Sequence, residues 1–350
     1  MCRLFALLLL SACSSREPAR LPSPEPPPAG AGEDGVPQVI ARPLPAEAGH
    51  PSGPEPVSGD PAPVAAPPVQ VDEVGTCDLP PRPRAGEIRT SVDLVFSEAG
   101  GTPLRLDLVT PSGDGPHPVV VLVHGGGWRA GEKAHLDVES RVLAGLGYAA
   151  ATVDYRLVPH RFPAAVADVR CAVRWLRAHA ADHDLDPERM GAIGFSAGGH
   201  LVALAGLAPE VTALDEGCTA QASSRLSSIV LFFAPTDLRA TADWPRPTAR
   251  IIERFLGVSA SEDPTLAALA SPIAHVDASD PPTLLVHGTA DTTVPIDQSR
   301  SLRDALEGVG VATTEVEVEG GGHGFGLFTP RPSLRAAPCT ALAFLEAHLR

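Results

Sequence analysis

Basic residues are scarce in this chain of 350 residues. It has 27 lysines and arginines against 42 aspartates and glutamates, which gives a formal net charge of −15. The basic residues form no cluster, whereas nucleic-acid binding needs a basic face that neutralises phosphates. The composition therefore predicts no nucleic-acid partner, and we attribute the acidity to solubility.

Cysteine is also scarce, and its spacing excludes a common class of site. None of the six cysteines stands in a C-x-x-C pair, which is the spacing typical of zinc centres and redox motifs. We therefore predict no metal site, and nothing in the sequence implies an organic cofactor.

The apolar run at the N-terminus, Leu4–Leu10, is too short to span a bilayer, which takes about 20 residues. A basic residue precedes the run and small residues follow it, a pattern that predicts an export signal. Leu10-Ser11-Ala12-Cys13 is similar to the bacterial lipobox. That resemblance implies that residues 1–12 are removed and that Cys13 is lipidated, with the cell envelope, favouring an outer membrane, as the destination. The alternative is a secreted protein with a chance cysteine after a plain signal peptide.

Residues 13–84 are rich in proline. Of the 38 prolines in the chain, 19 lie between Pro18 and Pro83. Proline at this density removes backbone donors and fixes φ, so neither helix nor sheet is expected. We predict a disordered, extended and semi-rigid linker.

Residues 85–350 predict one α/β domain. Segments 87–96 and 102–110 indicate an antiparallel edge hairpin, and after them strands alternate with helices, which predicts a mostly parallel eight-stranded sheet covered on both faces. Residues 235–281 leave room for a small lid at most. We expect the further strands near 118–123, 148–154, 189–195, 227–233, 283–287 and 313–319, and helices near 136–146, 163–182, 197–207 and 335–349.

The segment Gly194-Phe195-Ser196-Ala197-Gly198 joins an apolar strand to a helix. A serine at the apex of such a sharp turn is held in a strained conformation with its hydroxyl outward. A hydroxyl is a weak nucleophile until a base accepts its proton. Ser196 is therefore the candidate nucleophile, and a histidine and an acid should accompany it.

Two downstream loops supply the acid and the base. Asp291 follows the buried strand that ends at His287, where active-site loops gather in open α/β sheets. His323 lies on a glycine-padded loop after the last strand. The order Ser196, Asp291, His323 is the order of α/β-hydrolases, and it differs from the orders of chymotrypsin and subtilisin.

An upstream glycine run suggests a site for a developing oxyanion. His124-Gly125-Gly126-Gly127-Trp128 follows a continuous apolar strand, and its glycines allow backbone N–H groups to approach a substrate. We expect the N–H groups of Gly126, Gly127 and Ala197 to form an oxyanion hole. A plain flexible loop is the alternative for the glycine run alone.

Five segments together resemble the bacterial esterases of the α/β-hydrolase fold: HGGGW at 124–128, DYR at 154–156, GFSAGG at 194–199, HGTAD at 287–291 and GGHGF at 321–325. The likeness covers roughly residues 88–349. It is nearest to the carbohydrate esterases with feruloyl- and acetylxylan-esterase-type members, beside the hormone-sensitive-lipase-like esterases. The lipase-like branch usually has an acidic residue before the serine, so Phe195 favours the carbohydrate-esterase branch.

The cysteines left after Cys13 are Cys77, Cys171, Cys218 and Cys339, and in an oxidising compartment they allow three pairings. In the fold that the resemblance implies, the helix with Cys171 flanks the loop with Cys218. This favours a Cys171–Cys218 disulfide without excluding the other pairings.

Several other residues have structural interpretations. We expect His124 to shape its loop, and His200 and His287 to be structural. Asp154 and Arg156 should brace loops near the site. Asp237, in a turn, is the second candidate for the acid. Phe195 is a candidate for the substrate pocket, and Trp128 could either line the pocket or pack beneath the loop.

The resemblance and the motifs predict a serine carboxylic-ester hydrolase for short acyl esters, with small-molecule or carbohydrate esters as substrates. The membrane enters only through the lipid anchor, and the sequence leaves the oligomeric state open. An aryl formamidase or a peptidase would use the same side chains, although peptidases of this fold usually carry a further large domain. A non-catalytic binding module is the other alternative, but such proteins typically lose a member of the triad.

Overall fold

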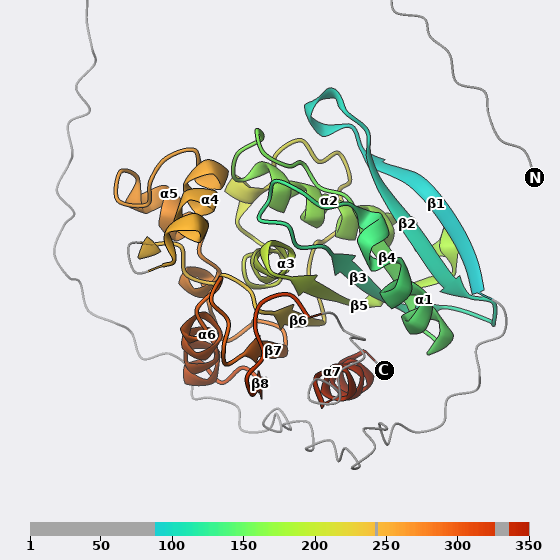
Figure 1. The fold of residues 1–350 in the computed structure, drawn as a ribbon. Coiled ribbons are helices and arrows are strands. Elements are labelled where there is room, and N and C mark those ends of the chain that lie inside the picture. The colour runs from blue at the N-terminus through green and yellow to red at the C-terminus, as the bar shows by residue number, and fades with distance from the viewer. Residues whose placement is uncertain (1–87, 242–243, 326–335, 350) are drawn as a thin grey trace, which may run out of the picture. The chain divides into compact units, whose positions relative to one another are not determined.

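A computed structural model describes residues 88–241, 244–325 and 336–349 (Figure 1). The predicted signal, the lipidation site at Cys13, the linker at 13–84 and Cys77 lie outside the described residues. In the part that is described, no helix combines the length and the apolar character that crossing a membrane requires.

Eight strands form one sheet in the order β1-β2-β4-β3-β5-β6-β7-β8. The first two strands form the expected antiparallel hairpin, and β2 also runs antiparallel to β4. All of the remaining neighbouring strands are parallel. The predicted mostly parallel eight-stranded α/β-hydrolase sheet is therefore confirmed. The strands are β1 (Ile88–Ser97), β2 (Leu104–Pro111), β3 (His117–Val123), β4 (Ala149–Val153), β5 (Leu185–Phe195), β6 (Ser228–Phe232), β7 (Thr283–Gly288) and β8 (Thr313–Val318).

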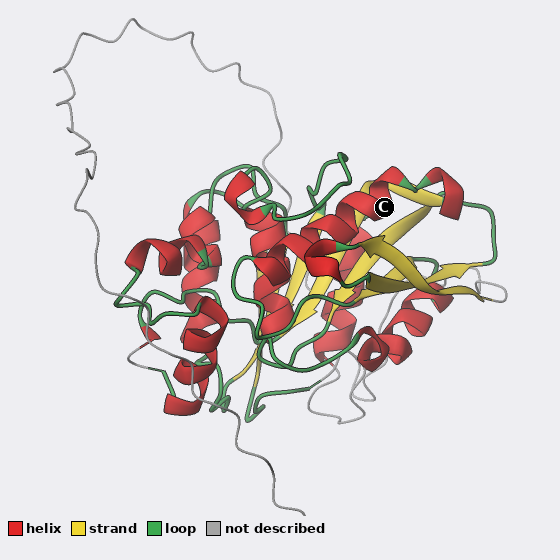
Figure 2. Cartoon of the chain, turned by 90° about the horizontal axis from the view of Figure 1, so that it is seen from above, coloured by secondary structure: helices red, strands yellow, loops and turns green. Residues whose placement is uncertain are grey.

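Helices cover both faces of the sheet, as Figures 1 and 2 show. Successive residues of β3 belong to two hydrophobic cores, one on each face of the sheet. Val121 packs in the core that includes residues of α2, α3 and α6, whereas Val120 and Leu122 pack in the core that includes residues of α1 and α7. This arrangement follows from the period of two along a strand, because both faces of a central strand are buried. The helices are α1 (Asp137–Gly145), α2 (Ala164–Ala178), α3 (Ala197–Leu207), α4 (Arg246–Leu256), α5 (Pro264–Leu269), α6 (Asp297–Gly308) and α7 (Ala336–His348).

The connection between α2 and β5 differs from the prediction. The helix expected to reach residue 182 ends at Ala178, and the strand expected from 189 begins at Leu185. A short 3-10 turn and Asp184, which has a left-handed φ of 56°, reverse the chain between them. Asp184 tolerates that conformation better than most residues do.

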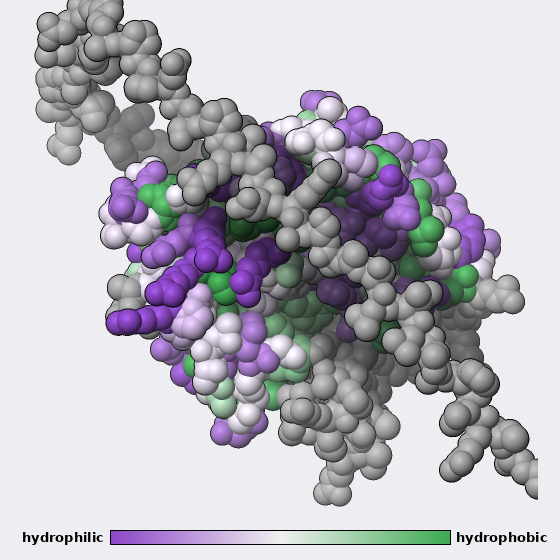
Figure 3. Space-filling view, turned by 45° about the horizontal axis from the view of Figure 1, so that its top comes forward, coloured by the Kyte–Doolittle hydropathy of each residue, from purple (hydrophilic) through white to green (hydrophobic). Residues whose placement is uncertain are grey.

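The segment between β6 and β7 contains α4 and α5, two short helices. This agrees with the expectation of a small lid at most. On the face shown in Figure 3, hydrophilic and intermediate residues predominate and hydrophobic residues occupy small areas.

The predicted Cys171–Cys218 disulfide is present, with its Cα atoms 5.4 Å apart. It connects the middle of α2 to the segment that follows α3. The same segment receives hydrogen bonds from the buried Arg170, whose guanidinium donates to the carbonyl oxygens of Ala208, Pro209 and Val211.

Candidate active site

Ser196 lies on a strained turn between β5 and α3. Its φ of 52° and ψ of −119° are unusual for a residue with a side chain. The turn requires glycine on both sides, because a Cβ at Gly194 would overlap the backbone of Gly198, and one at Gly198 would overlap the carbonyl of Val123. The strand–turn–helix expected from the sequence therefore presents Ser196 at the carboxyl end of the sheet.

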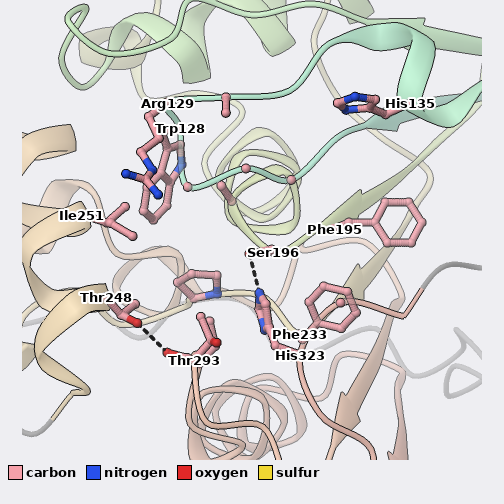
Figure 4. Close-up of a pocket in the computed structure, with 18 of the residues that line it drawn as sticks. Trp128, Arg129, His135, Phe195, Ser196, Phe233, Thr248, Ile251, Thr293 and His323 are labelled. Atoms are coloured by element: carbon pink, nitrogen blue, oxygen red, sulfur yellow. Dashed lines mark hydrogen bonds between the residues drawn. The ribbon is translucent and has the colours of Figure 1, made fainter.

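The side chains of Ser196, His323 and Asp291 form one hydrogen-bonded chain. The Nε2 atom of His323 lies 2.9 Å from the Oγ atom of Ser196 (Figure 4), and its Nδ1 atom lies 2.7 Å from the Oδ2 atom of Asp291. The Asp291 side chain is fully buried, whereas that of His323 is 21 % exposed. The loops after β7 and β8 thus carry Asp291 and His323 to Ser196. His323 is 127 positions from Ser196 in the sequence and 32 positions from Asp291.

Asp291 receives hydrogen bonds on both carboxylate oxygens. The backbone N–H groups of Thr293 and Val294 donate to Oδ1 over 2.8 and 3.0 Å, and His323 and His287 lie on Oδ2. Burial acts to raise the pKa of Asp291, but these donors outweigh it and hold that pKa well below its usual range. Asp291 is therefore a carboxylate at neutral pH.

The glycine loop after β3 presents backbone N–H groups to the same pocket. Gly126 and Gly127 have positive φ values of 123° and 60°. A Cβ at Gly126 would overlap the carbonyl of Ala130, whose N–H donates to the Gly126 oxygen over 3.2 Å. Among the described residues, the N–H groups of Gly126, Gly127 and Ala197 have no hydrogen-bond acceptor, so they are available to an oxyanion beside Ser196.

Trp128 fulfils both interpretations that the sequence left open. Its side chain lines the pocket, although only 2 % of the residue is exposed. Its ring stacks on Phe255 of α4 with centroids 4.3 Å apart, and its backbone carbonyl accepts from the N–H of Val158. Trp128 thereby holds the glycine loop against α4.

A pocket of about 570 Å³ opens at Ser196. In Figure 4, Phe195 and His135 lie on one side of Ser196, while Thr248 and Ile251 of α4 lie on the other. The pocket walls are mainly apolar. Polar side chains also line it, among them Arg129, His135, Glu139, Thr248 and Thr293.

The other histidines near the motifs have structural contacts. His124 stacks on Tyr155 with centroids 4.4 Å apart, and burial lowers its pKa. The Nε2 atom of His200 lies 2.8 Å from the carbonyl of Ala270, and burial lowers the pKa of His200 to about 4. Neither ring contacts Ser196 in the described structure, which leaves His323 as the base that reaches the hydroxyl.

The remaining candidates lie outside the hydrogen-bonded chain. Asp154 accepts the backbone N–H of Lys133 over 2.8 Å, and Arg156 pairs with the buried Asp168 at 2.8 Å, so both brace loops as expected. Asp237, the second candidate for the acid, pairs with Arg239 at 2.7 Å. The structure therefore gives no support to Asp237 as the partner of His323.

Two features of the site had no clear signal in the sequence. The lid helix α4 contributes Thr248 and Ile251 to the pocket wall, which only the packing of α4 reveals. His287 contacts Asp291 from behind, and its place in the HGTAD segment was the only hint. In the described ranges, no group of three or more histidine, cysteine or acidic side chains could hold a metal ion.

Comparisons with known proteins identify relatives of this chain. A family model described as BD-FAE matches residues 106–306. Esterase LipC of Mycobacterium tuberculosis (strain ATCC 25618 / H37Rv) is 33% identical over 243 residues, covering 67% of this chain and 59% of that protein. Esterase LipQ of the same organism is 33% identical over 215 residues, covering 60% and 51%. The chain thus spans about half to three fifths of the length of these curated relatives.

Two solved structures are similar to about three quarters of this chain. A truncated form of a carbohydrate esterase from gut microbiota is 26% identical, with a TM-score of 0.65, and the match covers 77% of this chain and 99% of that one. A thermophilic esterase from the planctomycete Thermogutta terrifontis, described with propionate bound, is 30% identical with a TM-score of 0.61, and covers 73% and 92%.

Proposed function

The chain belongs to the BD-FAE family, and from this premise we propose that it is a serine hydrolase of carboxylic esters. The observation that carries the proposal is the chain of hydrogen bonds from Ser196 through His323 to the buried Asp291, on a strained turn that faces N–H groups without an acceptor in the described part of the chain. Nucleophile, base, orienting acid and oxyanion donors are the four parts that acyl transfer by a serine requires.

The mechanism follows from these positions. The Nε2 atom of His323 accepts the proton of Ser196 as Oγ attacks the ester carbonyl. The carbonyl oxygen becomes an oxyanion and accepts hydrogen bonds from the N–H groups of Gly126, Gly127 and Ala197. Loss of one such donor typically costs about 3–4 kcal/mol of transition-state stabilisation. His323 then protonates the departing alcohol. Water, activated by the same histidine, attacks the acyl-enzyme and releases the acid.

Asp291 holds His323 in the tautomer that this reaction needs. Its Oδ2 atom accepts the Nδ1–H of His323, so Nε2 is left without a proton and faces Ser196. When His323 becomes an imidazolium, the buried carboxylate stabilises the positive charge. The low pKa of Asp291 keeps that carboxylate ionised throughout the cycle.

The substrate that we propose is an ester with a short acyl group whose alcohol part is a carbohydrate. The pocket of about 570 Å³ has mainly apolar walls that suit a small acyl chain. Two solved relatives support the choice: the Thermogutta terrifontis esterase is described with propionate and with butyrate bound, and the gut-microbiota relative is described as a carbohydrate esterase. Phe195 in place of an acidic residue favours the same branch.

A panel of esters tests the function. Hydrolysis of p-nitrophenyl acetate and butyrate should exceed that of the laurate, and release of acetate from acetylated xylan would identify a carbohydrate ester as substrate. Release of ferulate from methyl ferulate would instead show that the pocket accepts an aromatic acyl group. Ser196→Ala and His323→Ala should each abolish nearly all turnover, and the double variant should be little worse, because triad members act as a unit. Ser228→Ala, which changes a buried serine at the start of β6, is the matched control. Full activity in Ser196→Ala would refute the mechanism.

We also propose that the mature protein is anchored to the cell envelope through lipid on Cys13. The support is the sequence Leu10-Ser11-Ala12-Cys13 and the proline-rich segment behind it, which would hold the catalytic domain away from the membrane. A single acyl chain binds only marginally, so stable anchoring requires the several chains of a lipoprotein.

A further inference from the structure

We propose that His287 is a positioning residue for catalysis, which holds the carboxylate of Asp291 in the orientation that His323 requires. The inference rests on the proposed function, because it extends the chain Ser196–His323–Asp291 by one further side chain. His287 does not line the pocket or contact Ser196 in the described structure. Its effect on the reaction would pass through Asp291, whereas an effect through its contact with the pocket-lining Val294 would appear in KM.

His287 lies near the end of β7, directly beneath the loop that carries Asp291. Its Nε2 atom is 3.3 Å from Asp291 Oδ2 and 3.0 Å from the backbone oxygen of Val294. The side chains of His287 and Asp291 are both fully buried. Each of the two oxygen atoms near Nε2 is an acceptor only. A nitrogen between two acceptors must carry the proton, so the tautomer of His287 follows from the geometry.

The other ring nitrogen is also held. Its Nδ1 atom lies 2.7 Å from the hydroxyl of Ser299 in α6, a residue that is 1 % exposed. Because Nε2 carries the proton in the neutral ring, Ser299 donates its hydroxyl to Nδ1. Helix α6 thus fixes the ring of His287, and the ring in turn fixes the turn from Asp291 to Val294.

The contact completes the set of donors around Asp291. Oδ1 receives the N–H groups of Thr293 and Val294, and Oδ2 receives Nδ1–H of His323 over 2.7 Å. The Nε2–H of His287, which donates to the Val294 carbonyl over 3.0 Å, also faces Oδ2 at 3.3 Å and attracts its negative charge. With two hydrogen bonds on Oδ1, one on Oδ2 and the N–H of His287 beside Oδ2, rotation of the carboxylate about its Cβ–Cγ bond would break favourable contacts in a buried place, which is unfavourable. The oxygen that faces His323 therefore keeps its direction while the imidazole gains and loses a proton.

This role makes a prediction that simple packing does not. His287→Leu keeps the bulk of the side chain and removes the N–H. It should lower kcat about 10- to 100-fold and leave KM within about twofold, because small misplacement of a reacting group has effects of that size. His287→Gln places an amide N–H near the position of Nε2 and should recover most of the lost kcat.

A double-mutant cycle with Asp291→Asn separates positioning from a general loss of structure. Asp291→Asn should lower kcat on the order of 10⁴-fold, since the wrong tautomer of His323 is then favoured. In that background, adding His287→Leu should change kcat less than about threefold, because residues that act through one another are non-additive. His117→Leu, a change of another buried histidine at the opposite end of the sheet, should show the same small effect on kcat in both backgrounds.

The experiment keeps the inference apart from the proposed function. Turnover of p-nitrophenyl acetate by the unaltered chain tests the function. The rate at which a fluorophosphonate probe labels Ser196 measures the reactivity of the nucleophile without turnover of a carboxylic ester, and should fall in His287→Leu and recover in His287→Gln. Two results would overturn the proposal. One is that His287→Leu lowers kcat by the same factor in the unaltered chain and in the Asp291→Asn background. The other is that His287→Gln recovers none of the lost kcat although its Tm is unchanged.

Discussion

Removal of the disulfide between Cys171 and Cys218 should destabilise the domain without impairing the site. The bond closes a loop with a sequence separation of 47 residues. In the chain-entropy treatment, opening a loop of that size increases the entropy of the unfolded chain enough to lower the free energy of unfolding by about 4 kcal/mol at 25 °C.

The native state should change little when the bond is lost. The guanidinium of Arg170 is fully buried and still holds three carbonyl oxygens of the segment after α3, between 2.6 and 3.0 Å away. The carbonyl groups that Arg170 holds follow directly after α3, at the end of that helix away from Ser196, about 16 Å along a helix of 11 residues. The effect of the disulfide is therefore concentrated in the unfolded state.

The test is Cys171→Ala combined with Cys218→Ala under non-reducing conditions. Urea unfolding gives the change in the free energy of unfolding, and thermal unfolding gives the melting temperature. The melting temperature should fall by about 8–16 °C, at about 2–4 °C for each kcal/mol in a domain of this size. Turnover at 25 °C should be unchanged. A loss of unfolding free energy below about 1 kcal/mol would refute the entropic reasoning, and a large loss of kcat in folded protein would refute the separation between this segment and the site.

Three further predictions follow from single residues. Asp291→Asn should lower kcat by orders of magnitude while the fold persists, whereas Asp237→Asn should not; the reverse result in steady-state kinetics would assign the acid to Asp237. Burial raises the pKa of Asp280 to about 6, above the value of about 3.9 in an unfolded chain. Its ionisation therefore destabilises the native state as pH rises through that window, so Asp280→Asn should increase the free energy of unfolding at pH 7 and leave it unchanged near pH 4, as urea titrations at both pH values would show. Cys13→Ala should release the protein from membranes or leave its signal uncut, and mass spectrometry that finds an unmodified mature N-terminus at another residue would contradict the lipid anchor.

The architecture could be predicted because its signals are local. Buried parallel strands appear as short apolar runs, such as Val119–Val123, and the glycines around Ser196 mark a turn that side chains would block. Boundaries were less accurate where the chain makes an irregular reversal. The reversal between α2 and β5 includes Asp184 in a left-handed conformation, which its residue type permits but does not require.

The three residues of the hydrogen-bonded chain could also be predicted from local features of the sequence. Ser196, Asp291 and His323 each follow a strand, and the carboxyl ends of parallel strands meet at one edge of the sheet. Chain order and loop position therefore nominate these residues. The export signal and the lipid anchor at Cys13 remain predictions from sequence.

What the sequence alone determined is the set of local segments: the strands, the elbow, the glycine loop and the loops that carry the acid and the base. Tertiary packing decided the choice between acids, because Asp237 pairs with Arg239 while Asp291 meets His323. It also placed Trp128 against Phe255 and His287 behind Asp291. These contacts depend on how separate elements pack and on which buried donors and acceptors then face one another, and local propensity and periodicity carry no information on either.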